Sequence, residues 1–373
     1  MLDKIFNYFS YYQWWKNLDK FILILIIFFF LIGLFFSLVS TSLIASDKLN
    51  TNSYFFFFKH LIFVSIGLII IFILSYIDQE SLYLISIYAF LVSLGLLILV
   101  PFIGTEVKGS TRWLDLFFLP RLQPIELLKP FYIIVLALII SNQRLYNFTI
   151  KFIISFAITS LIILLLILQP DLGQTLLIGL SWVILIFISG LNLFLLLSLS
   201  ALGIIVLLYI AFYIPKFEYI KNRLLSFFDT KTGTHNFQSD KALDSITSGG
   251  FFGKGIGEGT LKNRVPEAHT DYIISVISEE FGVIVIILIL VLFIVFIFSI
   301  LKKVSIEQNN KARLILVGTT SLILLQAMIH IGVNIRLFPT TGMTLPFLSY
   351  GGSSIISVAI LSGIILNLTK RKI

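Results

Sequence analysis

The sequence of 373 residues contains no cysteine, which excludes disulfide bonds and thiolate metal sites. Charged residues are also scarce, at 12% of the chain, whereas hydrophobic residues make up 58%. A composition this apolar excludes an ordinary soluble domain and indicates a polytopic membrane protein. We therefore expect an all-α fold that forms a single integral membrane domain over residues 1–373.

Ten apolar runs approach the roughly 20 residues that a membrane-spanning helix needs. The first run follows Trp14, Trp15 and Lys16 and lacks a small-residue cleavage site, so we expect a retained helix and not a signal peptide. The ten expected helices lie near 20–44, 55–77, 82–103, 125–141, 150–168, 172–189, 193–214, 272–301, 312–334 and 347–368.

Basic residues are divided unevenly between alternate connections of these helices. By the positive-inside rule, the division places both termini in the cytoplasm, with a large extracytoplasmic loop, 215–271, between helices 7 and 8. The net charge of +8 then reflects helix orientation and anionic lipid, so nucleic acid is not an expected partner. The inner set is Lys4, Lys16, Lys20, Arg144, Lys151, Lys302, Lys303, Lys311, Arg313, Lys370, Arg371 and Lys372, against Lys48, Lys108, Arg112, Arg121 and Arg336 outside.

Every unusual polar motif falls on the outer side of this topology. Charged side chains at membrane depth are costly, and their default interpretation is functional. The convergence of the motifs on one face therefore predicts a single extracytoplasmic site. The motifs are KGSTRW (108–113), QPIELLKP (123–130), QPDLG (169–173), PEAHTD (266–271), and PTTG with PFLSYGGSS (339–342 and 346–354).

These motifs resemble those of the SEDS family (shape, elongation, division and sporulation) in their order and spacing, and the resemblance covers nearly the whole chain. It implies a glycosyltransferase that polymerises lipid II into peptidoglycan strands outside the bacterial cytoplasmic (inner) membrane. Residues 240–244 and 255–260 look more like the division members than the elongation members. The resemblance also implies a class B penicillin-binding protein transpeptidase and other division or elongation membrane proteins as partners.

Asp271 is the candidate catalytic residue. Glycosyl transfer needs a base that takes the proton from the attacking hydroxyl, and a carboxylate is suitable. Undecaprenyl diphosphate departs without a general acid when cationic side chains or a metal hold its charge, so one carboxylate can suffice. The resemblance implies that Asp271 is this base. From the residues alone, the alternative is that Asp271 or Thr270 caps the eighth helix. No cofactor is certain, and a divalent cation stays open.

Arg112, Trp113 and Lys129 are candidate substrate-binding residues. Arg forks onto a diphosphate, and Trp stacks on a sugar; the alternative for Trp113 is the interfacial aromatic belt. Lys129 lies inside the fourth span before a proline, and its ammonium is expected to hold the diphosphate. The alternative for Lys129 is a structural ion pair with Glu126.

The remaining candidates are acidic residues and one histidine. Glu267 and His269 are expected to orient Asp271 or to contact sugar hydroxyls, with solvated loop residues as the alternative. Asp171 is expected to cap the sixth helix. Glu279 and Glu280 are expected to be supporting residues, and the glycine-rich run 249–259 a flexible loop that closes over the substrate.

Two other functions compete with polymerisation. A lipid II flippase needs a polar path through the whole membrane, whereas the inner connections carry only orienting charge. A non-enzymatic scaffold of the cell-wall machinery leaves the outer cluster of Arg, Lys, Glu and Asp without a use. The motif asymmetry favours the glycosyltransferase.

Overall fold

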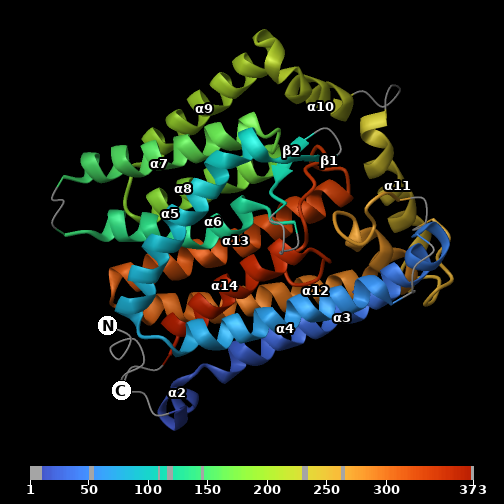
Figure 1. Ribbon diagram of the computed structural model, residues 1–373, viewed down its shortest axis with the longest axis horizontal. Coiled ribbons are helices and arrows are strands. Elements are labelled where there is room, and N and C mark those ends of the chain that lie inside the picture. The colour runs from blue at the N-terminus through green and yellow to red at the C-terminus, as the bar shows by residue number, and fades with distance from the viewer. Residues whose placement is uncertain are drawn as a thin grey trace.

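The computed structural model describes residues 11–49, 54–107, 110–115, 121–143, 147–228, 234–261 and 265–370 (Figure 1). Each of the ten predicted apolar runs forms a helix. Among the described residues, eight helices are long and apolar enough to cross a membrane. The ten helices are α3 (Lys20–Leu49), α4 (Phe55–Tyr76), α5 (Gln79–Ile103), α6 (Pro124–Ser141), α7 (Phe148–Leu168), α8 (Leu172–Ile188), α9 (Leu193–Tyr213), α12 (Ile273–Ile306), α13 (Asn310–Asn334) and α14 (Gly352–Leu368).

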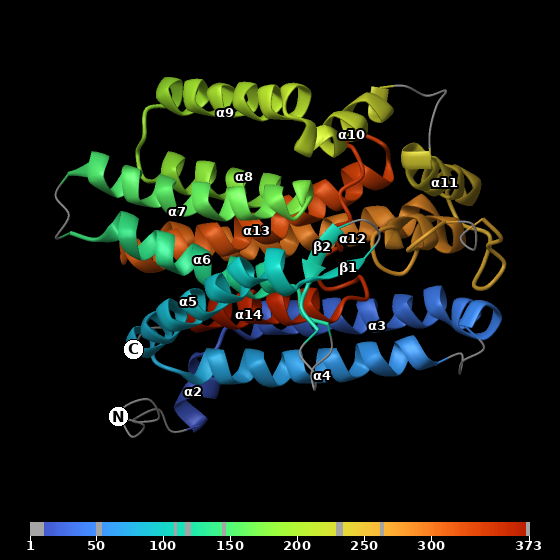
Figure 2. The ribbon, with the colours of Figure 1, turned by 45° about the horizontal axis from the view of Figure 1, so that its top comes forward.

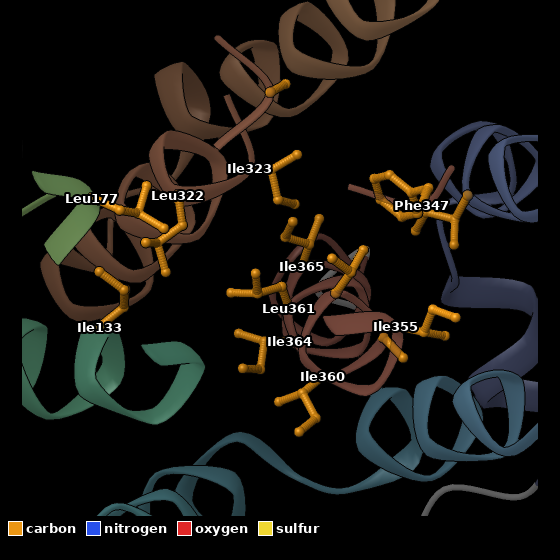
Figure 3. Packing of buried hydrophobic residues seen from close by; sticks show 14 of the residues in the cluster. Ile133, Leu177, Leu322, Ile323, Phe347, Ile355, Ile360, Leu361, Ile364 and Ile365 are labelled. Atoms are coloured by element: carbon orange, nitrogen blue, oxygen red, sulfur yellow. The ribbon is translucent and has the colours of Figure 1, made fainter. Parts of the chain in front are cut away.

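Helices α8 and α14 are the two shorter apolar helices, with 17 residues each. Helix α14 is surrounded by other helices, and every residue from Ser357 to Leu368 is buried. Figure 3 shows its Leu361 and Ile364 pointing toward α6 and α13. Lipid tails are as apolar as leucine, so close van der Waals packing, not exclusion of water, holds such a helix in place.

The segment between α9 and α12 is folded and not only a loop. It contains a 3₁₀ turn (Pro215–Phe217), α10 (Glu218–Phe228) and α11 (Thr234–Gly249). The all-α expectation also misses a short antiparallel pair, β1 (Thr105–Val107) and β2 (Ser110–Trp113). These elements lie toward one end of the bundle, whereas α2 (Tyr11–Asn17) lies at the other (Figure 2).

The glycine-rich run is docked against a break in α12, and its closure over the substrate stays a prediction. Gly282 interrupts α12 with φ 79°. The break leaves helix carbonyls without their intrahelical partners, and the Lys254 backbone N–H donates to the Glu279 carbonyl at 2.9 Å. A Cβ on Gly282 would lie 2.1 Å from the Phe251 carbonyl oxygen, so only glycine fits at this close approach.

The two ends of the described chain meet beside the C-terminal end of α4. Trp14 donates its indole N–H to the Ser75 carbonyl at 3.1 Å, and Lys370 donates to the Ile77 carbonyl at 3.3 Å. A chain that begins and ends at the same end of a bundle has an even number of crossings. Five basic residues of the orientation argument lie outside the described residues: Lys4, Lys108, Arg144, Arg371 and Lys372.

Candidate functional site

Asp271 lies in the turn that leads into α12. Its backbone N–H donates to the Glu267 carbonyl at 3.1 Å, and its carbonyl accepts from Asn334 Nδ2 at 3.1 Å. Tyr272 is the N-cap of α12, so the alternative that Asp271 or Thr270 caps this helix is wrong. The backbone of Asp271 is therefore fixed from two sides, by its own turn and by the end of α13.

Glu267 shapes the turn that presents Asp271. Its φ is +54°, a left-handed conformation that is unfavourable for a residue with a side chain. Its carbonyl accepts the backbone N–H groups of Thr270 and Asp271, both at 3.1 Å, and of Tyr272 at 3.3 Å. Such strain costs about 1–3 kcal/mol and persists where the surroundings impose it. The geometry supports an orienting role for Glu267.

His269 joins the PEAHTD run to the PFLSYGGSS run. Its carbonyl accepts from the Tyr350 backbone N–H at 3.1 Å, and the two rings lie 5.8 Å apart. Ser349 Oγ donates to the Thr270 carbonyl at 2.7 Å. The imidazole also packs on Phe56 of α4, with ring centroids 5.2 Å apart. Two motifs that are 75 or more residues apart in the sequence thus form one surface.

Arg112 joins the RW motif on β2 to the QPDLG turn. It donates to the carbonyls of Gln169 and Pro170, and its Nε lies 3.7 Å from Asp171 Oδ2. Asp171 is the N-cap of α8, where its side chain accepts from the Gln174 backbone N–H at 3.3 Å. The predicted capping role of Asp171 is confirmed. The same carboxylate also holds the Arg112 guanidinium in place.

Gly342 lies beside both Asp271 and Arg112. Its φ is +68°, and a Cβ on this residue would lie 3.5 Å from Asp271 Oδ2 and 3.9 Å from Arg112 Nη1. A carboxylate and a guanidinium therefore flank one small volume that the glycine leaves unfilled. Glycosyl transfer with a diphosphate leaving group uses a group that takes a proton and a cation that holds the leaving anion, and a carboxylate and a guanidinium suit these two tasks.

Lys129 forms a buried ion pair with Glu126. Its Nζ lies 2.7 Å from Glu126 Oε2, and the Lys129 side chain is 0% exposed. Gln174 Nε2 donates to Glu126 Oε1 at 2.7 Å, and Lys129 donates to Gln326 Oε1 at 2.8 Å. Gln326 in turn donates to the Thr344 carbonyl at 3.0 Å. The structural ion pair is thus present, and contact between Lys129 and substrate stays a prediction.

Comparisons with known proteins decide the family. The model of the cell cycle protein family of FtsW, RodA and SpoVE matches residues 19–372. The chain belongs to this family, the SEDS family.

Several SEDS proteins are similar over almost their whole length. A Caulobacter vibrioides protein named "Probable peptidoglycan glycosyltransferase FtsW" is 29% identical over 96% of this chain and 91% of its own. A Coxiella burnetii protein of the same name is 33% identical over 88% and 90%. A chain of a solved peptidoglycan synthase complex that coordinates polymerization and crosslinking has a TM-score of 0.77 at 25% identity, covering 95% of this chain and 98% of that one. The rod shape determining protein RodA of Thermus thermophilus has a TM-score of 0.68 at 25% identity, with 95% and 97% covered.

Other predicted residues of this SEDS chain lie around the site. Trp113 is half-buried at the end of β2, and its stacking on a sugar stays a prediction. Glu279 is 0% exposed and accepts from the Leu261 backbone N–H at 2.9 Å, while its Oε1 lies 3.4 Å from Lys254 Nζ. Glu280 is buried on the same stretch of α12. These contacts support a structural role for Glu279 in holding the glycine-rich run.

A metal site is not apparent in the part of the chain that the structure describes. No three His, Asp or Glu side chains gather there in a way that could hold an ion. The divalent cation therefore stays an open alternative.

Sequence reasoning missed five residues of this SEDS site. Asn334, Ser349 and Gln326 act through hydrogen bonds to distant segments, and Gly342 acts through the space that it leaves. Gly342 and Ser349 lie within the PTTG and PFLSYGGSS motifs, but nothing local in the sequence marks the contacts that these four residues make. The fifth residue is Arg223 of α10, which donates to the Thr340 carbonyl at 3.4 Å, two residues before Gly342. It did have a signal, because it is a basic residue on an amphipathic stretch of the segment 215–271.

Proposed function

We propose that this protein is a peptidoglycan glycosyltransferase that polymerises lipid II on the outer side of the bacterial inner membrane. The observation that carries the proposal is the convergence of Asp271 Oδ2 and Arg112 Nη1 on the volume beside Gly342. Its curated relatives of similar length, named "Probable peptidoglycan glycosyltransferase FtsW", support the same activity. They also support a role in cell division.

Asp271 acts as the general base in the proposed reaction. The acceptor hydroxyl attacks the anomeric carbon of the lipid-linked donor, and its proton passes to Asp271. The bond between the anomeric carbon and the phosphate oxygen breaks, and its electron pair leaves with undecaprenyl diphosphate. Arg112 stabilises the charge that develops on this leaving group. The hydrogen bonds from Asn334 and to Glu267 keep Asp271 in position during the transfer.

The proposed topology has ten membrane-spanning helices in a single domain, with both termini cytoplasmic and residues 215–271 outside. The meeting of Trp14 and Lys370 beside the end of α4 supports an even number of crossings. Since the chain has no cysteine, single-cysteine labelling can test the two sides. A cysteine at Lys302 should react with a membrane-impermeant maleimide only in opened cells, and one at Asp244 in intact cells whose outer membrane has been permeabilised to the reagent.

The proposed partner is a class B penicillin-binding protein that crosslinks the new strands, together with other membrane proteins of the division or elongation machinery. The fold shared with a chain of the peptidoglycan synthase complex supports this assignment. Lipid II is the proposed substrate because the reaction needs a diphosphate leaving group and a sugar hydroxyl.

Polymerisation of lipid II by the purified protein with its transpeptidase partner tests the proposal. We expect Asp271→Asn, which keeps the side-chain shape and removes the base, to lose strand formation by about 100-fold or more. Asp115→Asn is the matched control, because this outer carboxylate is 48% exposed and pairs with the exposed Arg121. The control should polymerise like the wild type. Equal polymer from a folded Asp271→Asn protein would contradict the role of Asp271 as the base. No polymer from the wild type in an assay proven competent would favour the flippase or scaffold alternative.

A further inference from the structure

Arg223 is a second guanidinium beside the site, on α10. Its Nη1 donates to the Thr340 carbonyl at 3.4 Å, two residues before Gly342. Helix α10 is fastened to the end of α7 by Tyr219, whose hydroxyl donates to the Ile167 carbonyl at 2.9 Å. Arg223 therefore approaches the segment of Gly342 from the outer segment, whereas Arg112 approaches it from β2.

Arg223 and Arg112 lie close enough to repel each other. Burial, and after it the nearby Arg112, lowers the pKa of Arg223 from its ordinary value, while Asp171, Tyr219 and Tyr272 raise it. Two like charges in a partly desolvated place are unfavourable unless an anion lies near both.

Asp171 does not supply a free anion for both cations. Its carboxylate caps α8, accepts from Gln123 Nε2 at 3.1 Å and lies 3.7 Å from Arg112 Nε. Asp271, the other carboxylate at this place, has its Oδ2 3.5 Å from the Gly342 Cβ position and is the proposed base. The structural partners of Asp171 are thus the N-terminus of α8, Gln123 and Arg112.

We propose that Arg223 and Arg112 together bind the diphosphate of the lipid-linked donor, with one guanidinium on each phosphoryl group. This inference rests on the proposed function and deepens it. A planar guanidinium binds phosphate oxygens in a two-pronged fork, which an ammonium cannot reproduce. Two such forks distinguish a diphosphate from a monophosphate. They also receive the negative charge when the bond to the anomeric carbon breaks.

The alternative is that Arg223 only fastens the 340–342 segment through the Thr340 carbonyl. The two roles differ in what Arg223→Lys does, because a lysine keeps the charge and can still donate to a carbonyl. A fastening residue tolerates the change, whereas a forked phosphate ligand does not.

Binding of undecaprenyl diphosphate and undecaprenyl monophosphate to the purified full-length protein in nanodiscs tests the proposal. We expect the wild type to prefer the diphosphate, and Arg223→Gln and Arg223→Lys each to weaken diphosphate binding by about tenfold or more and to reduce that preference. Arg121→Gln is the matched control, since Arg121 is an outer arginine that is 60% exposed. It should bind both lipids like the wild type.

Three outcomes would overturn the proposal. They are a wild type without preference for the diphosphate, a folded Arg223→Lys variant that binds it as tightly as the wild type, and phosphatidylglycerol competing as well as the unlabelled diphosphate. The assay includes no acceptor and no turnover, so it reports binding of the lipid alone. If the protein binds the diphosphate in a way that depends on Arg223 but does not polymerise lipid II, the result counts against the proposed reaction and not against this site.

Discussion

Helices α13 and α9 are both apolar enough to cross a membrane, yet they contribute differently to the protein. In its most apolar stretch, α13 has a mean hydropathy of 2.0 and is 78% buried, whereas α9 has a mean hydropathy of 2.7 and is 6% buried. The less apolar helix is the more deeply packed one. Its Gln326, His330 and Asn334 each hydrogen bond to a segment of the site. Polarity within a span, and not its length, therefore locates the functional half.

The difference follows from the cost of polar groups in lipid. An unsatisfied polar group in hydrocarbon costs several kcal/mol, so a span facing lipid carries few of them. On α9, Ser198 and Ser200 donate to carbonyls of their own helix, at 3.0 Å and 2.9 Å. On α13, the hydroxyls of Thr319, Thr320 and Ser321 likewise donate within their own helix. The amide and imidazole side chains of Gln326, His330 and Asn334 find partners on other segments. Substitutions in the two regions should therefore have very different effects.

The largest effect is expected from breaking the buried ion pair that α13 helps to hold. Lys129→Met leaves Glu126 buried without its cation, which should reduce stability by about 3–5 kcal/mol. The double variant Glu126→Gln with Lys129→Met removes both charges and should recover most of that loss. Thermal unfolding of the purified variants measures both effects. A double variant no more stable than the single one would show that the pair is not the origin of the loss.

A smaller loss is expected from Gly282→Ala at the break in α12. With φ 79°, the strain on an alanine costs about 1–3 kcal/mol, and its Cβ would also meet the Phe251 carbonyl. Gly95→Ala on α5 is the matched control, because a Cβ there meets nothing within 4 Å and alanine favours helix. In the wild type, the docked glycine-rich run should exchange its backbone amide hydrogens slowly. We expect faster exchange of these hydrogens in Gly282→Ala. Unchanged exchange would contradict the docking.

A more local effect is expected from Asn334→Ala at the end of α13. The substitution removes the hydrogen bond to the Asp271 carbonyl. We expect the activation free energy of the reaction to rise by about 1–3 kcal/mol, which corresponds to roughly a tenfold or greater fall in polymerisation rate. Asn309→Ala at the start of the same helix loses only an N-cap, worth about 1 kcal/mol of stability. That control should unfold earlier but polymerise normally when folded. Equal polymerisation rates for the two variants would show that Asn334 does not contribute to the reaction.

The helices were predictable from the sequence, whereas the contacts between them were only partly predictable. Runs of about 20 apolar residues have few alternatives to a helix in a membrane, so all ten helices appear where expected. The cap at Asp171 was predictable because capping depends on residues within one turn. The docking of the run 249–259 on α12 was not predictable, for a physical reason. Glycine permits both flexibility and close approach, and only the break at Gly282 selects the second.

The candidate site shows the same limit. The ionisable residues at Arg112 and Asp271 were predictable because charge is rare in so apolar a chain. Gly342 and Asn334 were not, since a glycine that leaves space and an amide that holds a carbonyl have no local signal. The assignment of Asp271 as the base stays a prediction that the polymerisation assay decides.

The smallest effect is expected on α9, where Leu202 is 56% exposed. Leu202→Ala removes contacts with lipid and few with protein, so stability should change by no more than about 0.5 kcal/mol. Leu322 on α13 is 0% exposed, and Leu322→Ala should cost about 2–5 kcal/mol by leaving a cavity. Thermal unfolding of the two variants compares the same substitution in the two regions. A large loss from Leu202→Ala in the isolated protein would mean that α9 packs against something other than lipid.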